Sequence, residues 1–253
     1  METRLPEVQV YREDALVFLA GLPDESVDLI VTDPPYESID KWRNMGSARC
    51  RRLIDWFPTV PYEYLADCLQ EMLRVLKRNR HCYVMGDWET THRHIYPDAE
   101  RLGWGTWPPV VWDKGSVGTG YHYRNCIEYV SFLEKGKRNL NSKSETNPLR
   151  FKSIRGKHAY PTEKPVTLCE TLVRQSSNEG EVVLDPFCGG APVGVAAQRL
   201  GRGFIGVDVW KKAVTLARGA IEHGMQPCEW AKSQGIVYRP PKDRKALRKR
   251  PPK

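Results

Sequence analysis

The sequence is notable first for what it lacks. It has no apolar run near the roughly 18 residues that cross a membrane, and its first thirty residues lack the basic-then-apolar pattern of a secretion signal. Its seven cysteines are an odd number without a Cys-x-x-Cys pair, which argues against a disulfide framework and a structural zinc site. We therefore expect no membrane contact and no bound metal, in a reduced intracellular compartment.

Positive charge is present in excess and is concentrated in three segments. Residues 41–52 contain five basic residues and no acid, residues 135–157 contain eight and one, and residues 240–253 contain seven and one, although the whole chain carries only +8. The rest of the chain is therefore acidic overall. Solvated loops would explain one such segment, but three of them favour a polyanionic partner.

Strand-like and helix-like segments alternate along the chain, which predicts an α/β fold with a doubly wound, mostly parallel sheet and helices on both faces. The expected strands are 7–11, 27–31, 81–85, 110–112, 127–132, 182–184 and 203–208, and the expected helices are 15–20, 62–76, 165–174, 192–200 and 211–222. We expect one domain, 1–239, with loops at 37–61 and 135–160, and a disordered, basic, Pro-rich tail at 240–253.

A glycine turn follows the apolar strand that ends at Asp185. The turn contains Phe187, Cys188, Gly189 and Gly190, and Asp208 ends the next strand. An acid about 20 residues beyond such a turn can bind a ribose diol. Neither Gly-x-Gly-x-x-Gly nor a P-loop is present, so a nucleoside without phosphates, such as S-adenosylmethionine (AdoMet), fits better than a dinucleotide. An ordinary strand-to-helix turn is the competing interpretation.

A second strand ends at Asp33-Pro34-Pro35-Tyr36. Proline cannot donate to a sheet ladder, so the two prolines force the chain out of the sheet. The Asp33 carboxylate and the Pro34 carbonyl, without a competing donor, can then accept hydrogen bonds from an exocyclic amino group, while Tyr36 offers a flat face for a base. A strand end with a packing tyrosine is the alternative.

These residues resemble the permuted (β-group) amino-DNA methyltransferases, which methylate adenine N6 or cytosine N4. Residues 33–36 match the catalytic Asp-Pro-Pro-Tyr tetrapeptide of that family, residues 161–165 resemble its Pro-Thr-Gln/Glu-Lys-Pro segment, and residues 185–190 resemble its AdoMet loop. Trp112-Asp113-Lys114 and Glu128 resemble its strand pair beside the target base. The resemblance spans residues 8 to about 220, and the catalytic tetrapeptide precedes the AdoMet loop, as in the permuted order of that family.

The resemblance implies a Rossmann-like AdoMet-dependent fold and assigns roles to individual residues. Asp33, Pro34, Pro35 and Tyr36 would be catalytic. The expected cofactor-binding residues are Asp14, Asp33, Lys164, Asp185, Phe187, Cys188, Gly189, Gly190 and Asp208. The basic residues expected to bind DNA are Lys41, Arg43, Arg49, Arg51, Arg52, Lys114, Lys143, Arg150, Lys152, Arg155 and Lys157.

The chain departs from the family pattern at two places. Ala191-Pro192 stands where glycine and threonine are usual, which predicts altered contacts rather than loss of the site. Residues 77–80 replace a Lys-Pro-Gly-Gly segment and are expected to form a different turn. The segment at 135–160 is short for a target-recognition region.

The expected function is methylation of a flipped adenine at N6 in duplex DNA at a specific site. Cytosine-N4 methylation on the same scaffold, a catalytically silent DNA-binding module, and RNA or protein methylation stay open as alternatives. The resemblance also suggests a restriction nuclease as partner, a homodimer, and a cytoplasmic location at the nucleoid of a prokaryotic or phage-infected cell.

Overall fold

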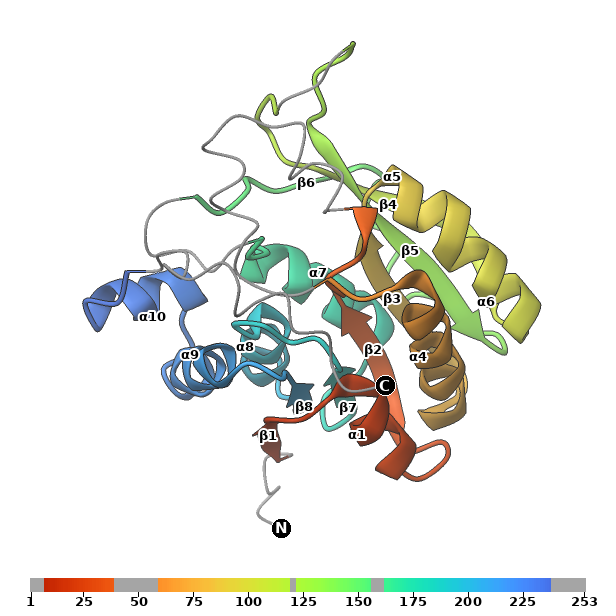
Figure 1. Ribbon diagram of the computed structural model, residues 1–253, viewed down its shortest axis with the longest axis horizontal. Coiled ribbons are helices and arrows are strands. Elements are labelled where there is room, and N and C mark those ends of the chain that lie inside the picture. The colour runs from red at the N-terminus through yellow and green to blue at the C-terminus, as the bar shows by residue number, and fades with distance from the viewer. Residues whose placement is uncertain (1–6, 39–58, 119–121, 156–161, 238–253) are drawn as a thin grey trace.

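One eight-stranded sheet runs through the computed structural model, which describes residues 7–38, 59–118, 122–155 and 162–237. The strands are β1 (Val8–Tyr11), β2 (Val27–Thr32), β3 (Leu76–Gly86), β4 (Gly105–Asp113), β5 (Ile127–Lys135), β6 (Leu149–Arg150), β7 (Val182–Asp185) and β8 (Gly203–Val207), in the order β1-β8-β7-β2-β3-β5-β4-β6. Only the β3–β5 and β5–β4 pairs are antiparallel. The expected mostly parallel sheet is confirmed (Figure 1).

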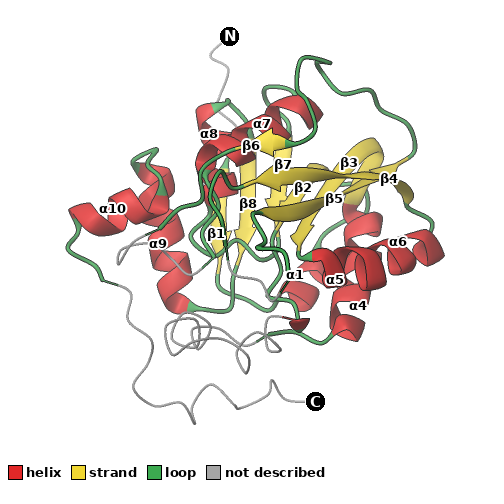
Figure 2. Ribbon diagram, turned by 90° about the horizontal axis from the view of Figure 1, so that it is seen from above, coloured by secondary structure: helices red, strands yellow, loops and turns green. Residues whose placement is uncertain are grey.

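Helices cover both faces of this sheet, as a doubly wound fold requires (Figure 2). The elements α1 (Ala15–Gly21), α4 (Tyr62–Val75), α5 (Trp88–Thr90), the π-helix η1 (Thr91–Ile95) and α6 (Tyr96–Leu102) belong to one side, and α7 (Val166–Ser176), α8 (Pro192–Arg199) and α9 (Lys211–Glu222) to the other; α10 (Pro227–Ser233) packs on α9. Along β3, Tyr83 and Met85 join one core cluster, whereas Cys82 and Val84 join the other. Because alternate side chains enter apolar clusters on opposite faces of the sheet, consecutive residues of this strand are all apolar.

Sequence reasoning placed the central strands correctly but missed several elements. The helical segment from α5 to α6 and the short helix α10 were not predicted, because their polar sequences have only weak apolar periodicity. The turn expected at 77–80 is wrong: these residues belong to β3, with Asn79 in the left-handed conformation at φ 57° and Arg80 paired with Lys135. Pairing with β5 begins at Arg80, and the register with β2 shifts between Leu76 and His81, so residues 77–79 are an irregular part of the strand.

The topology divides the sheet into a carboxyl edge, where β1, β2, β7 and β8 end, and an amino edge, where they begin. The segment expected as one loop at 135–160 has parts at both edges. Asn141 bonds to Arg174 and Ser177 beyond the end of α7, at the amino edge, whereas β6 pairs with the end of β4 at the carboxyl edge. The site-bearing strands meet at the carboxyl edge.

Candidate active site

Two motifs about 150 residues apart in sequence lie on neighbouring strands. β2 pairs with β7, and the Thr32 hydroxyl donates to Asp185 Oδ1 at 2.7 Å. The Asp33-Pro34-Pro35-Tyr36 segment and the glycine turn after Asp185 therefore leave the sheet side by side. Parallel pairing, which no local pattern encodes, creates this proximity.

The tetrapeptide forms a tight turn after β2. The Tyr36 amide donates to the Pro34 carbonyl at 2.9 Å, and the Val60 amide donates to the Pro35 carbonyl at 2.8 Å. The expectation that the Pro34 carbonyl has no competing donor is therefore wrong, because a turn this tight brings the Tyr36 N–H onto it. A carbonyl has two lone pairs, so the Pro34 oxygen can still accept a second hydrogen bond.

Hydrogen bonds connect the end of this turn with the helix that follows β3. The Ser38 hydroxyl donates to Asp87 Oδ2 at 2.6 Å and lies 3.2 Å from the Thr90 hydroxyl. Asp87 also caps α5 by accepting from the Thr90 amide at 2.8 Å. Sequence reasoning missed Asp87, which fixes the Asp33–Tyr36 turn from the end of the neighbouring strand β3.

Four charged side chains form a row of alternating sign that starts at the tetrapeptide. The Lys164 ammonium pairs with the Asp33 carboxylate and lies 3.4 Å from Glu128 Oε2, and Glu128 Oε1 lies 2.5 Å from Lys114 Nζ. The Lys164 side chain is 6% exposed and the Asp33 side chain 23%. The structure therefore places Lys164, expected at the cofactor, directly on Asp33.

The charges in this row shift one another's pKa. Burial would lower the pKa of Lys164, but Asp33 and Glu128 outweigh burial and raise it. Burial opposes ionisation of Glu128 as well, yet Lys164 and Lys114 hold its pKa below its ordinary value. Burial raises the pKa of Asp33 despite the opposing field of Lys164, and it raises the pKa of Tyr36. Tyr36 thus stays neutral, as a stacking ring requires.

The glycine turn after β7 is held by two acids, of which Asp185 is buried and Asp208 is partly exposed. Asp208 accepts from the Gly189 amide at 3.0 Å and from the Trp210 amide at 2.7 Å. Asp185 accepts from the Phe187 amide at 3.1 Å as well as from Thr32. Burial raises the pKa of Asp185 to about 7 and that of Asp208 to about 6. Each oxygen of Asp208 takes one backbone hydrogen bond and so keeps capacity for a ligand hydroxyl.

The remaining residues of this turn fix its backbone through hydrogen bonds and close packing. The Cys188 side chain is 3% exposed, and its amide and carbonyl are bonded to Val207 and Ala191. A Cβ on Gly190 would lie 2.9 Å from Leu216 Cδ2, so Gly190 allows close packing against α9. Ala191 is left-handed, with φ 56°, at the N-cap of α8, where glycine would be unstrained. Ala191, which stands where the family usually has glycine, thus adopts the left-handed backbone conformation that favours glycine.

Asp14 has a structural role that sequence reasoning did not foresee. Its Oδ1 accepts from the Leu16 and Val17 amides at 3.0 and 3.2 Å, which caps α1, and the Tyr64 hydroxyl lies 2.9 Å from both of its oxygens. Asp14 therefore joins the end of β1 to α4 at the carboxyl edge, and its Oδ2 keeps capacity for a further donor.

The acids of this edge fit the expected cofactor. AdoMet carries a sulfonium and an ammonium group, and its ribose diol donates hydrogen bonds. Asp33, Asp185 and Asp208 present carboxylates from the ends of β2, β7 and β8, and the pKa of each is raised by burial, which a bound cation would offset. The glycine turn leads into α8, which has no side-chain cap and begins with Pro192, a residue without an N–H.

Gln226, at the start of α10, is a further residue that sequence reasoning missed. Its amide nitrogen donates to Glu163 Oε1 at 2.6 Å and to the Lys164 carbonyl at 3.0 Å, while its oxygen accepts from the Val166 amide at 2.8 Å. Gln226 thus fixes the Glu163 side chain and the backbone from Lys164 to Val166. No sequence signal exists for it, because its partners lie about 60 residues earlier.

The expected DNA-binding residues are only partly brought together. Arg150 pairs with Asp113 at 2.8 Å, and Arg155 donates to Ser116 at 2.8 Å, so both lie against the loop that begins at Lys114. Lys152 is exposed between them. Lys143 instead follows Ser142, whose amide binds Gln175 near the end of α7, at the amino edge. Lys41, Arg43, Arg49, Arg51, Arg52, Lys157 and the tail at 240–253 lie outside the described residues.

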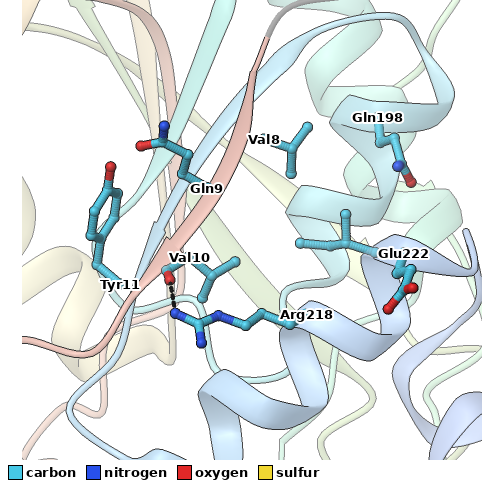
Figure 3. A pocket seen from close by; sticks show the side chains of 8 residues that line it. Val8, Gln9, Val10, Tyr11, Gln198, Arg218 and Glu222 are labelled. Carbon is cyan, nitrogen blue, oxygen red and sulfur yellow. Dashed lines mark hydrogen bonds between the residues drawn. The ribbon is translucent and has the colours of Figure 1, made fainter.

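A surface pocket of about 510 Å³ lies at another place, along the unpaired side of β1. Val8, Gln9 and Val10 line it together with residues of α8 and α9, and Arg218 donates to the Val10 carbonyl at 2.7 Å (Figure 3). Three strand spacings, about 14 Å, separate β1 from β2. The pocket therefore belongs to the sheet's outer edge rather than to the Asp33 site.

The described residues contain neither a metal-binding cluster nor a membrane-spanning helix. No group of three or more His, Cys, Asp or Glu side chains there is placed to hold a metal ion. No helix in those ranges is both long and apolar enough to span a membrane.

Comparisons with known proteins agree with the fold and identify the family. The DNA methylase family of N6 and N4 amino-methyltransferases matches residues 27–219, so the chain belongs to this family. DNA adenine methyltransferase YhdJ of Escherichia coli K12 is 26% identical over 237 residues, covering 78% of this chain and 76% of its own. The cofactor of the family, AdoMet, is therefore the cofactor of this chain.

Two solved structures show the same fold. TTHA0409 from Thermus thermophilus, described as a DNA modification methylase and solved with AdoMet, superposes with a TM-score of 0.63 at 23% identity, covering 86% of this chain and 94% of its own. The cytosine-N4-specific PvuII DNA methyltransferase superposes with a TM-score of 0.67 at 14% identity, covering 90% and 89%. The fold is therefore shared with a cytosine-N4-specific enzyme and does not by itself identify the target base.

Proposed function

We propose that this DNA methyltransferase transfers the methyl group of AdoMet to N6 of an adenine flipped out of duplex DNA. The observation that carries the proposal is the position of Asp33, which lies beside Tyr36 at the carboxyl edge next to the glycine turn. The adenine-specific relative and the aspartate at position 33 favour adenine over cytosine.

Each residue then has a chemical task. AdoMet, when bound, supplies a methyl group activated by a sulfonium. An Asp33 oxygen accepts one N–H of the target amino group and aims the nitrogen at the methyl carbon. It takes the proton that the nitrogen loses when the nitrogen–carbon bond forms and the carbon–sulfur bond breaks, which leaves S-adenosylhomocysteine as the neutral thioether. Tyr36 stacks on the extruded base and offsets part of the few kcal/mol of unstacking.

The cofactor and the DNA occupy different parts of the edge in this proposal. Asp208 binds the ribose diol, and the Asp185 and Asp33 carboxylates provide a negative field for the cationic groups. Arg150, Lys152 and Arg155 bind phosphates in a sequence-independent manner. A cognate nuclease, a homodimer and a cytoplasmic location accompany the proposal as expectations, and light scattering with and without DNA tests the dimer.

A nucleoside digest after incubation with unmethylated DNA and labelled AdoMet tests the reaction. Label in N6-methyladenine is expected, and label in N4-methylcytosine would keep the mechanism while changing the base. Asp33→Ala should abolish turnover and leave AdoMet binding measurable by calorimetry, whereas Asp67→Asn, an exposed control on α4, should behave as wild type. Turnover by Asp33→Ala would refute the assigned role of Asp33.

A further inference from the structure

The described structure presents a difficulty for the proposed function. The Asp33 carboxylate, which should accept the target amino group, is already paired with the buried Lys164 ammonium. Asp33 has two oxygens, but a neutralised carboxylate is a weaker acceptor than a free one. Something must weaken this ion pair when the base arrives.

Glu128 is placed to do so. Its Oε2 lies 3.4 Å from Lys164 Nζ, so a small rotation of the lysine exchanges one carboxylate for another. Glu128 lies on β5 opposite Trp112, and the Lys114 amide donates to the Cys126 carbonyl at 2.9 Å. The strand pair therefore holds both Glu128 and Lys114 in fixed positions beside Asp33.

We propose that Glu128 is a positioning residue that shares the Lys164 ammonium with Asp33, so that Lys164 moves toward Glu128 when a target amino group binds. Lys114 limits this exchange because it competes for Glu128 at 2.5 Å. The inference rests on the proposed function, since it concerns the acceptor state of Asp33.

Burial is the physical reason for such a pairwise exchange. Lys164 is 6% exposed, and removing the only partner of a buried charge costs several kcal/mol. With two carboxylates in reach, the ammonium is never unpaired while it moves. Gln226 fixes the Lys164 backbone, so that rotation of the side chain alone accomplishes the exchange.

The exchange predicts opposite effects for two substitutions. The ionisable groups whose fields interact with Asp33 are Lys164, Glu128, Lys114, Asp185, Tyr36 and Cys169. Glu128 raises the pKa of Asp33 and Lys114 lowers it. Glu128→Gln should therefore confine Lys164 to Asp33 and lower that pKa, whereas Lys114→Gln should let Glu128 draw Lys164 away and raise it.

The experiment measures kcat against pH at saturating AdoMet and DNA. In Glu128→Gln the acid limb should move to lower pH by about one unit, with a plateau kcat lower by about 10- to 100-fold. In Lys114→Gln the acid limb should move to higher pH. If Lys114 only contacted DNA, KM and its salt dependence would change, and the acid limb would stay in place.

Two exposed controls match these changes in charge. Glu145→Gln and Lys212→Gln remove one acid and one base from the surface and should reproduce the wild-type pH profile. Acid limbs that move in the same direction in Glu128→Gln and Lys114→Gln, or that do not move, would overturn the inference. Wild-type protein that methylates neither base would refute the proposed function itself, which is a distinguishable result.

Discussion

Each edge of the sheet carries a cluster of acidic and basic side chains. The central aspartates of the two clusters differ in exposure and in their hydrogen-bond partners. At the amino edge, Asp28 is 4% exposed and binds Lys77 at 2.9 Å, Arg80 at 3.3 Å and the Val182 amide at 3.0 Å. At the carboxyl edge, the Asp33 side chain is 23% exposed, and among the described residues its hydrogen bond comes from Lys164 alone.

The difference indicates how a structural carboxylate can be distinguished from one with a proposed reactive role. Asp28 is buried and accepts hydrogen bonds from a backbone N–H and two cations, so a ligand cannot reach it, and its partners join β2, β3 and β7. Asp33 keeps lone pairs directed at a partly open edge. Buried ion pairs alone are weak indicators of function, whereas unsaturated ones at strand ends are better indicators.

The largest expected effect separates the two aspartates. Asp33→Asn should lower kcat by about 10³-fold with little loss of stability, because it removes a charged acceptor at a partly exposed position. Asp28→Asn should leave kcat per folded molecule unchanged and lower the free energy of unfolding by about 2 kcal/mol, because it weakens a buried charge cluster. Urea titration measures the free energy of unfolding, and steady-state kinetics measure kcat. Equal effects of the two substitutions on these quantities would contradict the difference between Asp33 and Asp28.

The second effect concerns pH. The pKa of Asp185, about 7, and that of Asp208, about 6, are raised by burial, so both acids are protonated in mild acid. AdoMet affinity should fall about thirtyfold between pH 8 and pH 5.5, because the cation favours ionised Asp185. Calorimetry at the two pH values measures the change.

The same shifts have a consequence for stability with a definite sign. Groups whose pKa is raised on folding stabilise the protein fully below about pH 4 and lose that contribution as the pH rises through 6 and 7. AdoMet should therefore raise Tm more at pH 8 than at pH 5.5. An equal rise at both values would contradict the assignment of Asp185 and Asp208 to the cofactor.

The third effect tests the support of the carboxyl edge. Gln226→Leu removes the three hydrogen bonds to residues 163, 164 and 166 and should lower the free energy of unfolding by about 1–2 kcal/mol. Gln234→Leu, an exposed change at the other end of α10, should have almost no effect. Similar losses in both variants would show that Gln226 has no special role.

The smallest effect concerns DNA binding. Arg155→Gln should weaken binding a few-fold and reduce the salt slope by about one, because Arg155 lies beside the Lys114 loop. Lys143→Gln should leave both quantities unchanged, because Lys143 lies at the amino edge. Binding isotherms at several salt concentrations test this prediction. An altered salt slope for Lys143→Gln would show that Lys143 contacts DNA, as expected from the sequence.

Much of the fold could be predicted, and the reason is visible in particular strands. Residues 27–31 and 182–184 are buried on both faces, so apolar content alone marks them as central parallel strands. The charged start of β3 and the π-helix η1 could not be predicted, because partner strands and neighbouring helices, rather than local propensity, decide them.

The sequence by itself determined the chemical parts: the Asp-Pro-Pro-Tyr turn, the glycine turn, Asp208 and Lys164, because proline and glycine restrict the backbone locally and their signals are local. Only the tertiary structure decided which charges meet. Parallel pairing of β2 with β7 joined Thr32 to Asp185, and the β4–β5 hairpin set Glu128 and Lys114 beside Lys164. Contacts between residues that lie so far apart in the sequence depend on topology, which no segment of the sequence encodes alone.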